Sequence, residues 1–348
     1  MSGVVMDLNV YLEVLSSPIK QYELNESKVP MGMDYDDLNC LMSQVKRLVY
    51  ISQAMKVPVS EREAVVNNMA TSKGVFTAIQ VSLGQRDMIG IRALHPIMDL
   101  FNRLVKELLF NNMIMEEYFV TQPQINAVST LLYRFSDETD RAEYQKKRAN
   151  FLRAATKNQS SAMHYVNQLF EQYAKLLVVR VDFSYKNEHK RQMTGTIAQQ
   201  HRERFFRNAK ANKLFDHMVG YIWKLEYGER RGFHYHMLFF FDGANVRQDI
   251  TLARLIGEYW SLNITAGAGI YYNCNLFKAD YDKLGIGMIA YSDLQMREVL
   301  QVVIEYLTKI DEFVRLALPE NARAFGRGEI VSPEGNKLGR PRLHNKQA

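Results

Sequence analysis

Two histidines stand one residue apart in the apolar, aromatic stretch GFHYHMLFFF at residues 232–241. Side chains of a β-strand alternate between its two faces, so we expect His234 and His236 on one face, about 7 Å apart along the chain. Two imidazoles on one face can bind a single divalent ion when a third ligand reaches them. The alternative that these residues leave open is an ordinary half-buried pair of hydrogen-bonded histidines.

Glu226 is the candidate for the third ligand. It lies eight residues before His234, at the end of a second strand-like run, YIWKLEY at 221–227. The polar, glycine-bounded segment GERRG at 228–232 predicts a hairpin turn between the two runs. In a simple hairpin register Glu226 falls opposite His234 on the same face, although a slip of one residue would turn it to the other face. The sequence therefore predicts a Glu/His/His metal site.

A tyrosine and a lysine further along the chain could complete a catalytic site. Residues 293–309 have the periodicity of an amphipathic helix with Asp293 as its N-cap. Tyr306 and Lys309 are three residues apart and so are neighbours on one helix face. The tyrosine hydroxyl could be the nucleophile of metal-assisted DNA nicking, with the lysine offsetting phosphate charge or favouring the phenolate. The alternatives are a core tyrosine and a solvated lysine.

Residues 176–330 resemble the HUH endonucleases, and most closely the inovirus-type replication initiation proteins of filamentous phages and prophages. The matching motifs are LVVRVDFS at 177–184, HYH at 234–236, YLTK at 306–309 and FGRG at 325–328. The resemblance implies a single catalytic tyrosine, a 5′-phosphotyrosyl intermediate and a requirement for Mg²⁺ or Mn²⁺. It makes the following assignments: His234 and His236 as metal ligands, Glu226 as the third ligand, Tyr306 as the nucleophile and Lys309 as its assistant.

The function that this resemblance implies is that of a rolling-circle replication initiator, which nicks and rejoins single-stranded or origin DNA. The sequence has no phosphate-binding Gly-Lys-Ser/Thr loop, so a helicase and a polymerase would come from the host. Homo-oligomerisation is compatible with this function, since one tyrosine must be reused or supplied by a second protomer. The alternatives are a non-catalytic prophage DNA-binding regulator that retains the fold, and a nickase of the relaxase or transposase type.

The order of elements predicts an α+β fold with helices on one face of an antiparallel sheet. We expect a strand at 176–185, a basic helix at 196–214, hairpin strands at 218–227 and 233–241, a helix at 249–259, extended runs at 269–274 and 285–291, and then the tyrosine helix. This nicking domain, of HUH/Rep type, spans residues 171–330.

The first 170 residues predict a helical domain whose role the sequence does not reveal. Its expected helices lie at 37–56, 60–83, 91–120, 124–135, 140–156 and 160–175, with a helix start at Pro96. Residues 331–348 are rich in basic residues, proline and glycine, which is typical of a mobile basic tail.

Positive charge gathers beside the first strand of the predicted nicking domain. The chain of 348 residues has a net charge of +6, and the segment 186–213 is strongly basic. Such a segment can neutralise a phosphate backbone, although a solvated face is the alternative. The residues expected to bind DNA are Arg180, Lys186, Lys190, Arg191, Arg202, Arg204, Arg207 and Arg327.

Composition and the N-terminal sequence predict a cytoplasmic protein with no membrane partner, and the resemblance to phage and prophage proteins implies that this is the cytoplasm of a bacterial host cell. No run of about 18 uncharged apolar residues occurs, so no transmembrane helix is expected. The N-terminus lacks a basic region and carries Asp7, which is unlike a signal peptide. The two cysteines, Cys40 and Cys274, have no metal or redox spacing and are expected to be buried apolar residues in a reducing compartment.

Overall fold

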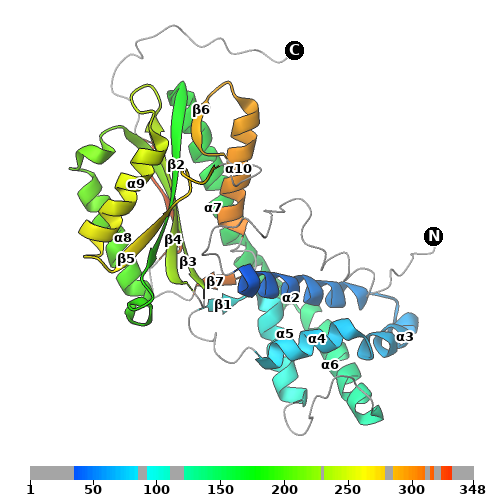
Figure 1. The fold of residues 1–348 in the computed structure, drawn as a ribbon. Coiled ribbons are helices and arrows are strands. Elements are labelled where there is room, and N and C mark those ends of the chain that lie inside the picture. Colours follow the sequence, from blue (N-terminus) through cyan, green and yellow to red (C-terminus); the bar gives the residue numbers. More distant parts are fainter. Residues whose placement is uncertain are drawn as a thin grey trace, which may run out of the picture.

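The computed structural model describes residues 35–84, 92–109, 121–228, 231–278, 285–309, 314–316 and 323–330 (Figure 1). The basic tail predicted at 331–348 lies outside these residues, as does 110–120, the end of one predicted helix. In the described part of the chain, no helix has a stretch long and apolar enough to cross a membrane. Cys274 is buried, as predicted, whereas the side chain of Cys40 is outside the described set.

Helices pack together in the N-terminal part of the chain. They are α2 (Tyr35–Ala54), α3 (Val59–Ala70), α4 (Lys73–Gly84), α5 (Pro96–Leu109) and α6 (Gln122–Asp140). Leu48, Phe101 and Phe135 are fully buried in their shared core. The single helix predicted at 60–83 is wrong, because Ser72 interrupts it. The Ser72 hydroxyl accepts a hydrogen bond from the backbone N–H of Val75, which starts a new helix there.

One long helix, α7 (Ala142–Gln172), links this helical part to a sheet. The sequence predicted two helices with a break at Asn158–Gln159, but polar residues without Gly or Pro do not end a helix. The first part of α7 contacts α5 and α6, while Tyr165, Leu169 and Phe170 pack against the sheet. Residue 170, where the helical domain was predicted to end, lies in the last turn of α7.

The sheet is antiparallel, and the α+β fold class is confirmed. Its strands are β2 (Lys175–Tyr185), β3 (Met218–Gly228), β4 (Gly232–Asp242), β5 (Gly269–Asn273), β6 (Gly287–Ala290) and β8 (Phe325–Arg327). They lie in the order β5-β2-β4-β3-β8, and β6 pairs with the first residues of β2. The β3–β4 hairpin has the predicted register, with Glu226 opposite His234.

Helices cover both faces of the sheet, not one face as predicted from the sequence (Figure 1). Val179, Val181 and Phe183 pack on the face covered by α8 (Gly195–Ala209), α9 (Asp249–Tyr259) and the π-helical turn η4 (Trp260–Ile264). The alternate residues Leu176 and Val178 pack beneath α7 and α10 (Leu294–Lys309). The reason is visible in β4, where residues 237–241 are all apolar, a pattern typical of a strand buried on both faces.

Three smaller elements complete the arrangement. The predicted basic helix at 196–214 ends at Ala209 and is followed by the 3₁₀ turn η3 (Lys213–Phe215). A second 3₁₀ turn, η2 (Lys190–Gln192), follows β2. A separate two-stranded antiparallel sheet joins β1 (Arg92–Leu94) to β7 (Val314–Leu316). The segment after α10 therefore returns to the helical part of the chain.

Candidate metal centre

Polar residues occupy one end of the sheet face that α7 and α10 cover. On β4 this face changes from Leu238 and Phe240, which are apolar, to His234 and His236. The neighbouring strands contribute Asp182 opposite His236 and Glu226 opposite His234. Cross-strand partners on one face lie close enough to interact, so three strands bring their ionisable side chains together here.

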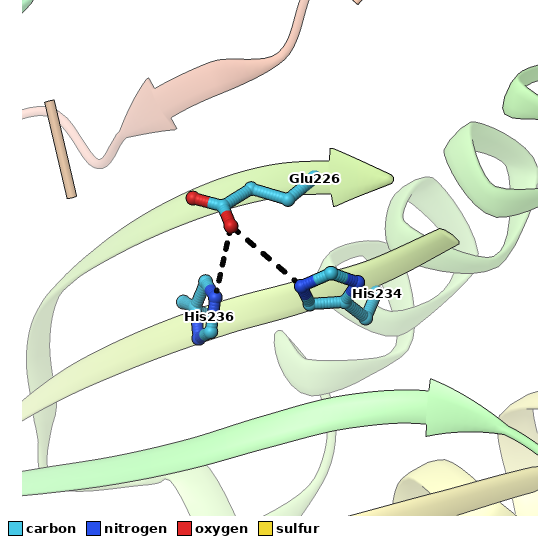
Figure 2. A group of neighbouring side chains, drawn as sticks. All are labelled: Glu226, His234 and His236. Carbon is cyan, nitrogen blue, oxygen red and sulfur yellow. Dashed lines mark ion pairs between the residues drawn. The ribbon is translucent and has the colours of Figure 1, made fainter. Parts of the chain in front are cut away.

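The predicted ligands Glu226, His234 and His236 form one cluster, which we call the Glu/His/His cluster (Figure 2). Glu226 Oε2 lies 3.6 Å from His234 Nε2 and 3.4 Å from His236 Nε2. The exposed fractions of these residues are 6%, 4% and 1%, respectively. Their potential ligand atoms all lie within 4.8 Å of one another, which is close enough to share one cation.

The second ring nitrogen of each histidine faces an oxygen atom, in a hydrogen bond for His234 and at ion-pair distance for His236. His234 Nδ1 lies 3.0 Å from the carbonyl oxygen of Gly232, and His236 Nδ1 lies 2.9 Å from Asp182 Oδ1. The carbonyl oxygen of Gly232 can only accept, so its hydrogen bond places a proton on His234 Nδ1 and leaves Nε2 facing Glu226. His236 instead has a carboxylate on each side, Asp182 at Nδ1 and Glu226 at Nε2. Metal-binding histidines are commonly oriented in this way by an outer acceptor.

Asp182 was not identified from the sequence as a partner of His236. Alternation placed Asp182 on the same strand face as Arg180, but the pairing of β2 with β4 joins segments about fifty residues apart and no turn length fixes it. Asp182 Oδ1 lies 3.5 Å from Arg180 Nε, and both side chains are buried. Lys224, opposite His236 on β3, is also buried.

Burial and the facing charges oppose each other in this cluster. Burial alone would raise the pKa of Glu226, but the imidazoles, chiefly His236, hold it well below its ordinary value. Burial favours neutral His236, yet Asp182 and Glu226 on either side raise its pKa. For His234, burial prevails and lowers the pKa. Glu226 is thus an ionised carboxylate and His234 a neutral imidazole, the forms that bind metal. The raised pKa of His236 favours its protonated form, which must lose the Nε2 proton before that nitrogen can bind a cation.

The residues present fit a divalent cation. Within the described residues, the buried atom Glu226 Oε1 has no hydrogen-bond partner, although an unsatisfied carboxylate oxygen in the interior is costly. A cation held by Glu226, His234 and His236 would satisfy that charge. A mixed set of imidazole and carboxylate ligands suits Mn²⁺ and other first-row divalent metals.

Helix α10 positions Tyr306 over the same face of the sheet. The helix begins beside β6 and runs along the sheet toward the end that carries the Glu/His/His cluster (Figure 1). Asp293 Oδ1 accepts from the backbone N–H of Met296, which confirms the predicted N-cap. Tyr306 is partly buried against the apolar cluster that contains Phe325, and Phe325 pairs with Lys224 on β3. Lys309 ends α10, and its side chain lies outside the described residues.

Three of the predicted DNA-binding arginines have interior contacts instead. Arg180 is buried beside Asp182, and Arg202 is buried with its guanidinium 4.0 Å from the Trp223 ring centroid. Arg327 donates to Ser161 Oγ at 2.9 Å and lies over the Tyr165 ring. Arginine packs its planar group on aromatic rings as readily as it binds phosphate, so these three residues have structural partners, and their contact with DNA stays a prediction.

The other predicted DNA contacts lie on α8 and in the segment that follows β2. Arg204 and Arg207 are exposed on α8, which covers the face opposite the Glu/His/His cluster. Lys186 and Arg191 are exposed in the segment that follows β2. The alkyl chain of Lys190 lies against Gly232, whose carbonyl faces His234 and whose φ of +68° favours glycine. Position therefore favours Lys186, Lys190 and Arg191 as contacts for a strand at the cluster.

A family model described as the YagK/YfjJ C-terminal domain matches residues 138–328. The chain belongs to this family. The match begins just before α7 and ends just after β8, so it includes α7, the six-stranded sheet, the Glu/His/His cluster and Tyr306. No curated protein and no solved structure matches the chain.

Proposed function

We propose that this protein nicks and rejoins single-stranded DNA through Tyr306, with the fold and chemistry of an HUH endonuclease. The observation that carries the proposal is the convergence of two imidazole Nε2 atoms on one Glu226 oxygen, on a sheet face covered by the tyrosine helix. The outer acceptors Gly232 and Asp182 support it, because they aim both imidazoles at a common point.

In the proposed reaction, Glu226, His234 and His236 hold Mg²⁺ or Mn²⁺. The bound cation would polarise the scissile phosphate. Tyr306 Oη attacks the phosphorus in line, so a bond from phosphorus to the tyrosine oxygen forms as the bond to the 3′ oxygen breaks. The phenol loses its proton to water, and the leaving 3′ oxygen takes up a proton. Lys309 offsets charge on the phosphate.

The products are a free 3′-hydroxyl and a 5′ end joined to Tyr306. The ester retains the energy of the phosphodiester bond, so a 3′-hydroxyl can attack it later and rejoin the strand without ATP. This chemistry suits a rolling-circle replication initiator that acts on origin DNA in the bacterial cytoplasm with a host helicase and polymerase. Rejoining would require either reuse of Tyr306 or a second protomer.

The charge balance of the site favours a second candidate, a non-catalytic DNA-binding regulator. Asp182 and Glu226 are buried together with two cations, Arg180 and Lys224. These four side chains cancel in formal charge without a metal ion, which is how a buried polar network can be stable. A protein that retained the fold and lost the reaction would bind DNA without metal and form no covalent product.

Covalent capture separates the two candidates. Full-length protein is incubated with Mn²⁺ and a random-sequence library of single-stranded oligonucleotides, and then denatured. The nickase predicts a protein–DNA adduct that survives denaturation, disappears in EDTA and is absent from Y306F. Metal-independent binding with no adduct at any metal concentration would support the regulator and reject the nickase.

A further inference from the structure

An exposed apolar surface lies on the edge strand β5 and the turn that follows it. The exposed fractions are 42% for Ile270, 52% for Leu276 and 40% for Phe277. The Phe277 ring stacks on Tyr272, with ring centroids 5.1 Å apart and an angle of 14° between the planes. Large apolar side chains exposed side by side often mark a binding surface.

This surface is on the same sheet face as the Glu/His/His cluster. Tyr272 is the register partner of Asp182, which is in turn the partner of His236. The side chain of Tyr272 packs with the cluster beneath α7 and α10, whereas its neighbour Tyr271 packs on the other face. Neighbouring strands lie about 4.8 Å apart, so β5 is about 10 Å from β4, close enough for one DNA strand to cross both.

Hydrogen bonds hold the turn that carries Phe277. Asn273 Oδ1 accepts from the backbone N–H of Leu276, and Asn273 Nδ2 donates to the Ile250 carbonyl. Asn275 Oδ1 accepts from the backbone N–H of Arg180, while its Nδ2 donates to Asp249. The rings are therefore held in place before any ligand arrives, which reduces the entropic cost of binding.

Lysines at both ends of β5 complement a phosphate backbone. The backbone N–H of Lys186 donates to the Ala268 carbonyl, just before β5, and the Lys186 side chain is exposed. Lys278 follows Phe277 directly, and its side chain is 43% exposed beside Asp249. Aromatic rings with nearby cations are the usual means by which proteins hold unpaired bases.

We propose that Tyr272 and Phe277 form a base platform, on which an unpaired base of the DNA strand stacks while that strand crosses the Glu/His/His cluster. The inference rests on the proposed function, since it supplies the strand that the cluster would cleave. Stacking on a ring requires an unpaired base, so the platform selects single-stranded over duplex DNA at this position and accepts any base.

The test compares two substitutions of the exposed ring. F277L keeps an apolar side chain but removes the ring, whereas F277W keeps a ring that can stack. Both are compared with wild type and with L262A, an exposed leucine on η4 at the opposite sheet face. Affinity is measured in EDTA by fluorescence anisotropy, on an oligonucleotide with all its bases and on an abasic chain of equal length.

We expect F277L to bind the base-containing strand roughly 5- to 150-fold more weakly, the range for removal of one base–aromatic stack. Binding to the abasic chain should be unchanged. F277W should restore affinity. The fluorescence of its added indole should be quenched when bases stack on it, and this signal can be assigned to position 277 because Trp223 and Trp260 are both buried. Equal affinity of F277L and wild type for the base-containing strand would overturn the platform. These affinities are measured without metal and test only the base platform. The absence of an adduct in Mn²⁺ is a separate result and would count against the proposed nicking activity.

Discussion

His236 lies between two carboxylates, Asp182 and Glu226, and this position decides how the site works. Asp182 faces one ring nitrogen and Glu226 faces the other. In the proposed metal site, Asp182 would hold the ring in place, and Nε2 would bind the cation after losing the proton that the raised pKa of His236 favours. Asp182 would thus position a ligand without being one itself.

Metal affinity tests these separate roles. We expect the double substitution H234A/H236A to abolish Mn²⁺ binding and E226A to weaken it less completely. D182N should reduce affinity by about 10- to 100-fold, as for other outer acceptors of metal-bound histidine. Isothermal titration calorimetry measures the effect, with D216N, at an exposed aspartate that directly follows η3, as the control. Unchanged Mn²⁺ binding in H234A/H236A would refute the site.

The sequence predicted those contacts of the site whose two residues lie close together along the chain. Glu226 and His234 belong to one hairpin, so turn length and alternation were enough to place them opposite each other. The partnership of Asp182 with His236 depends on non-local pairing and could not be predicted in this way. The same limit applies to Arg202, whose stacking on Trp223 joins a helix to a distant strand.

At the scale of elements, the face that each helix covers decides which basic residues could contact a DNA strand at the Glu/His/His cluster. Helix α8 was predicted as the phosphate-binding element because of its charge, but its apolar side packs on the sheet face opposite the Glu/His/His cluster. Charge in a sequence does not reveal which side of a sheet a helix covers. The segment after β2, which includes η2, lies at the cluster instead.

Charge reversal distinguishes these two elements. K186E/R191E should weaken binding of single-stranded DNA and reduce the log–log salt slope by roughly 0.7 for each phosphate that is no longer neutralised. R207E/K210E makes the same change in net charge at exposed positions on and just after α8, and should leave the slope nearly unchanged. Anisotropy titrations at several salt concentrations measure the DNA affinity and the salt slope of both variants. A larger slope change in the α8 variant would mean that the strand binds the other face.

The N-terminus of α9 contains a carboxylate whose contribution depends on pH. Burial would raise the pKa of Asp249, but hydrogen bonds from Lys278 and Asn275 outweigh it and lower the pKa below its ordinary value of 3.8. The ionised form is therefore favoured in the folded protein. Its stabilising effect is complete above the ordinary pKa and disappears as the pH falls through the lowered one.

D249N should accordingly lower Tm at neutral pH, because it removes a charge-assisted hydrogen bond of about 1.5–3 kcal/mol. The difference from wild type should remain constant down to about pH 5 and narrow below about pH 4, where Asp249 of the unfolded wild-type chain becomes protonated before that of the folded one. Thermal denaturation, followed by circular dichroism at several pH values in this range, measures the Tm difference between D249N and wild type. A Tm difference that grows on acidification would contradict the assigned direction of the pKa shift.

On the scale of the whole molecule, α7 and the β1–β7 pairing both join the helical part to the elements of the sheet domain, as far as the described residues show. Helix α7 spans both, and β7 pairs with β1 shortly after α10 ends. Periodicity predicted most of the helices and strands, because each is encoded locally. It could not predict the β1–β7 pairing or the continuity of α7 across both parts, since these depend on long-range packing.

Through the β1–β7 pairing, the helical part contacts the chain that follows the tyrosine helix α10. A93P should disrupt this sheet, because proline fixes φ near −65° where an antiparallel strand requires about −140°. We expect slower adduct formation with unchanged Mn²⁺ affinity, since β7 restrains the chain just after Tyr306. A93S is the control. Abolished Mn²⁺ binding in A93P would indicate general unfolding instead of a local effect on α10.

The central claim is that Tyr306 becomes covalently joined to DNA in a reaction that needs the Glu/His/His cluster. The most direct measurement is peptide mapping by mass spectrometry of the adduct formed in Mn²⁺, after nuclease digestion. The account predicts a nucleotide attached to Tyr306, no adduct in Y306F or H234A/H236A, and DNA affinity in Y306F close to that of wild type. A nucleotide attached to another tyrosine, or full nicking activity in Y306F, would contradict it.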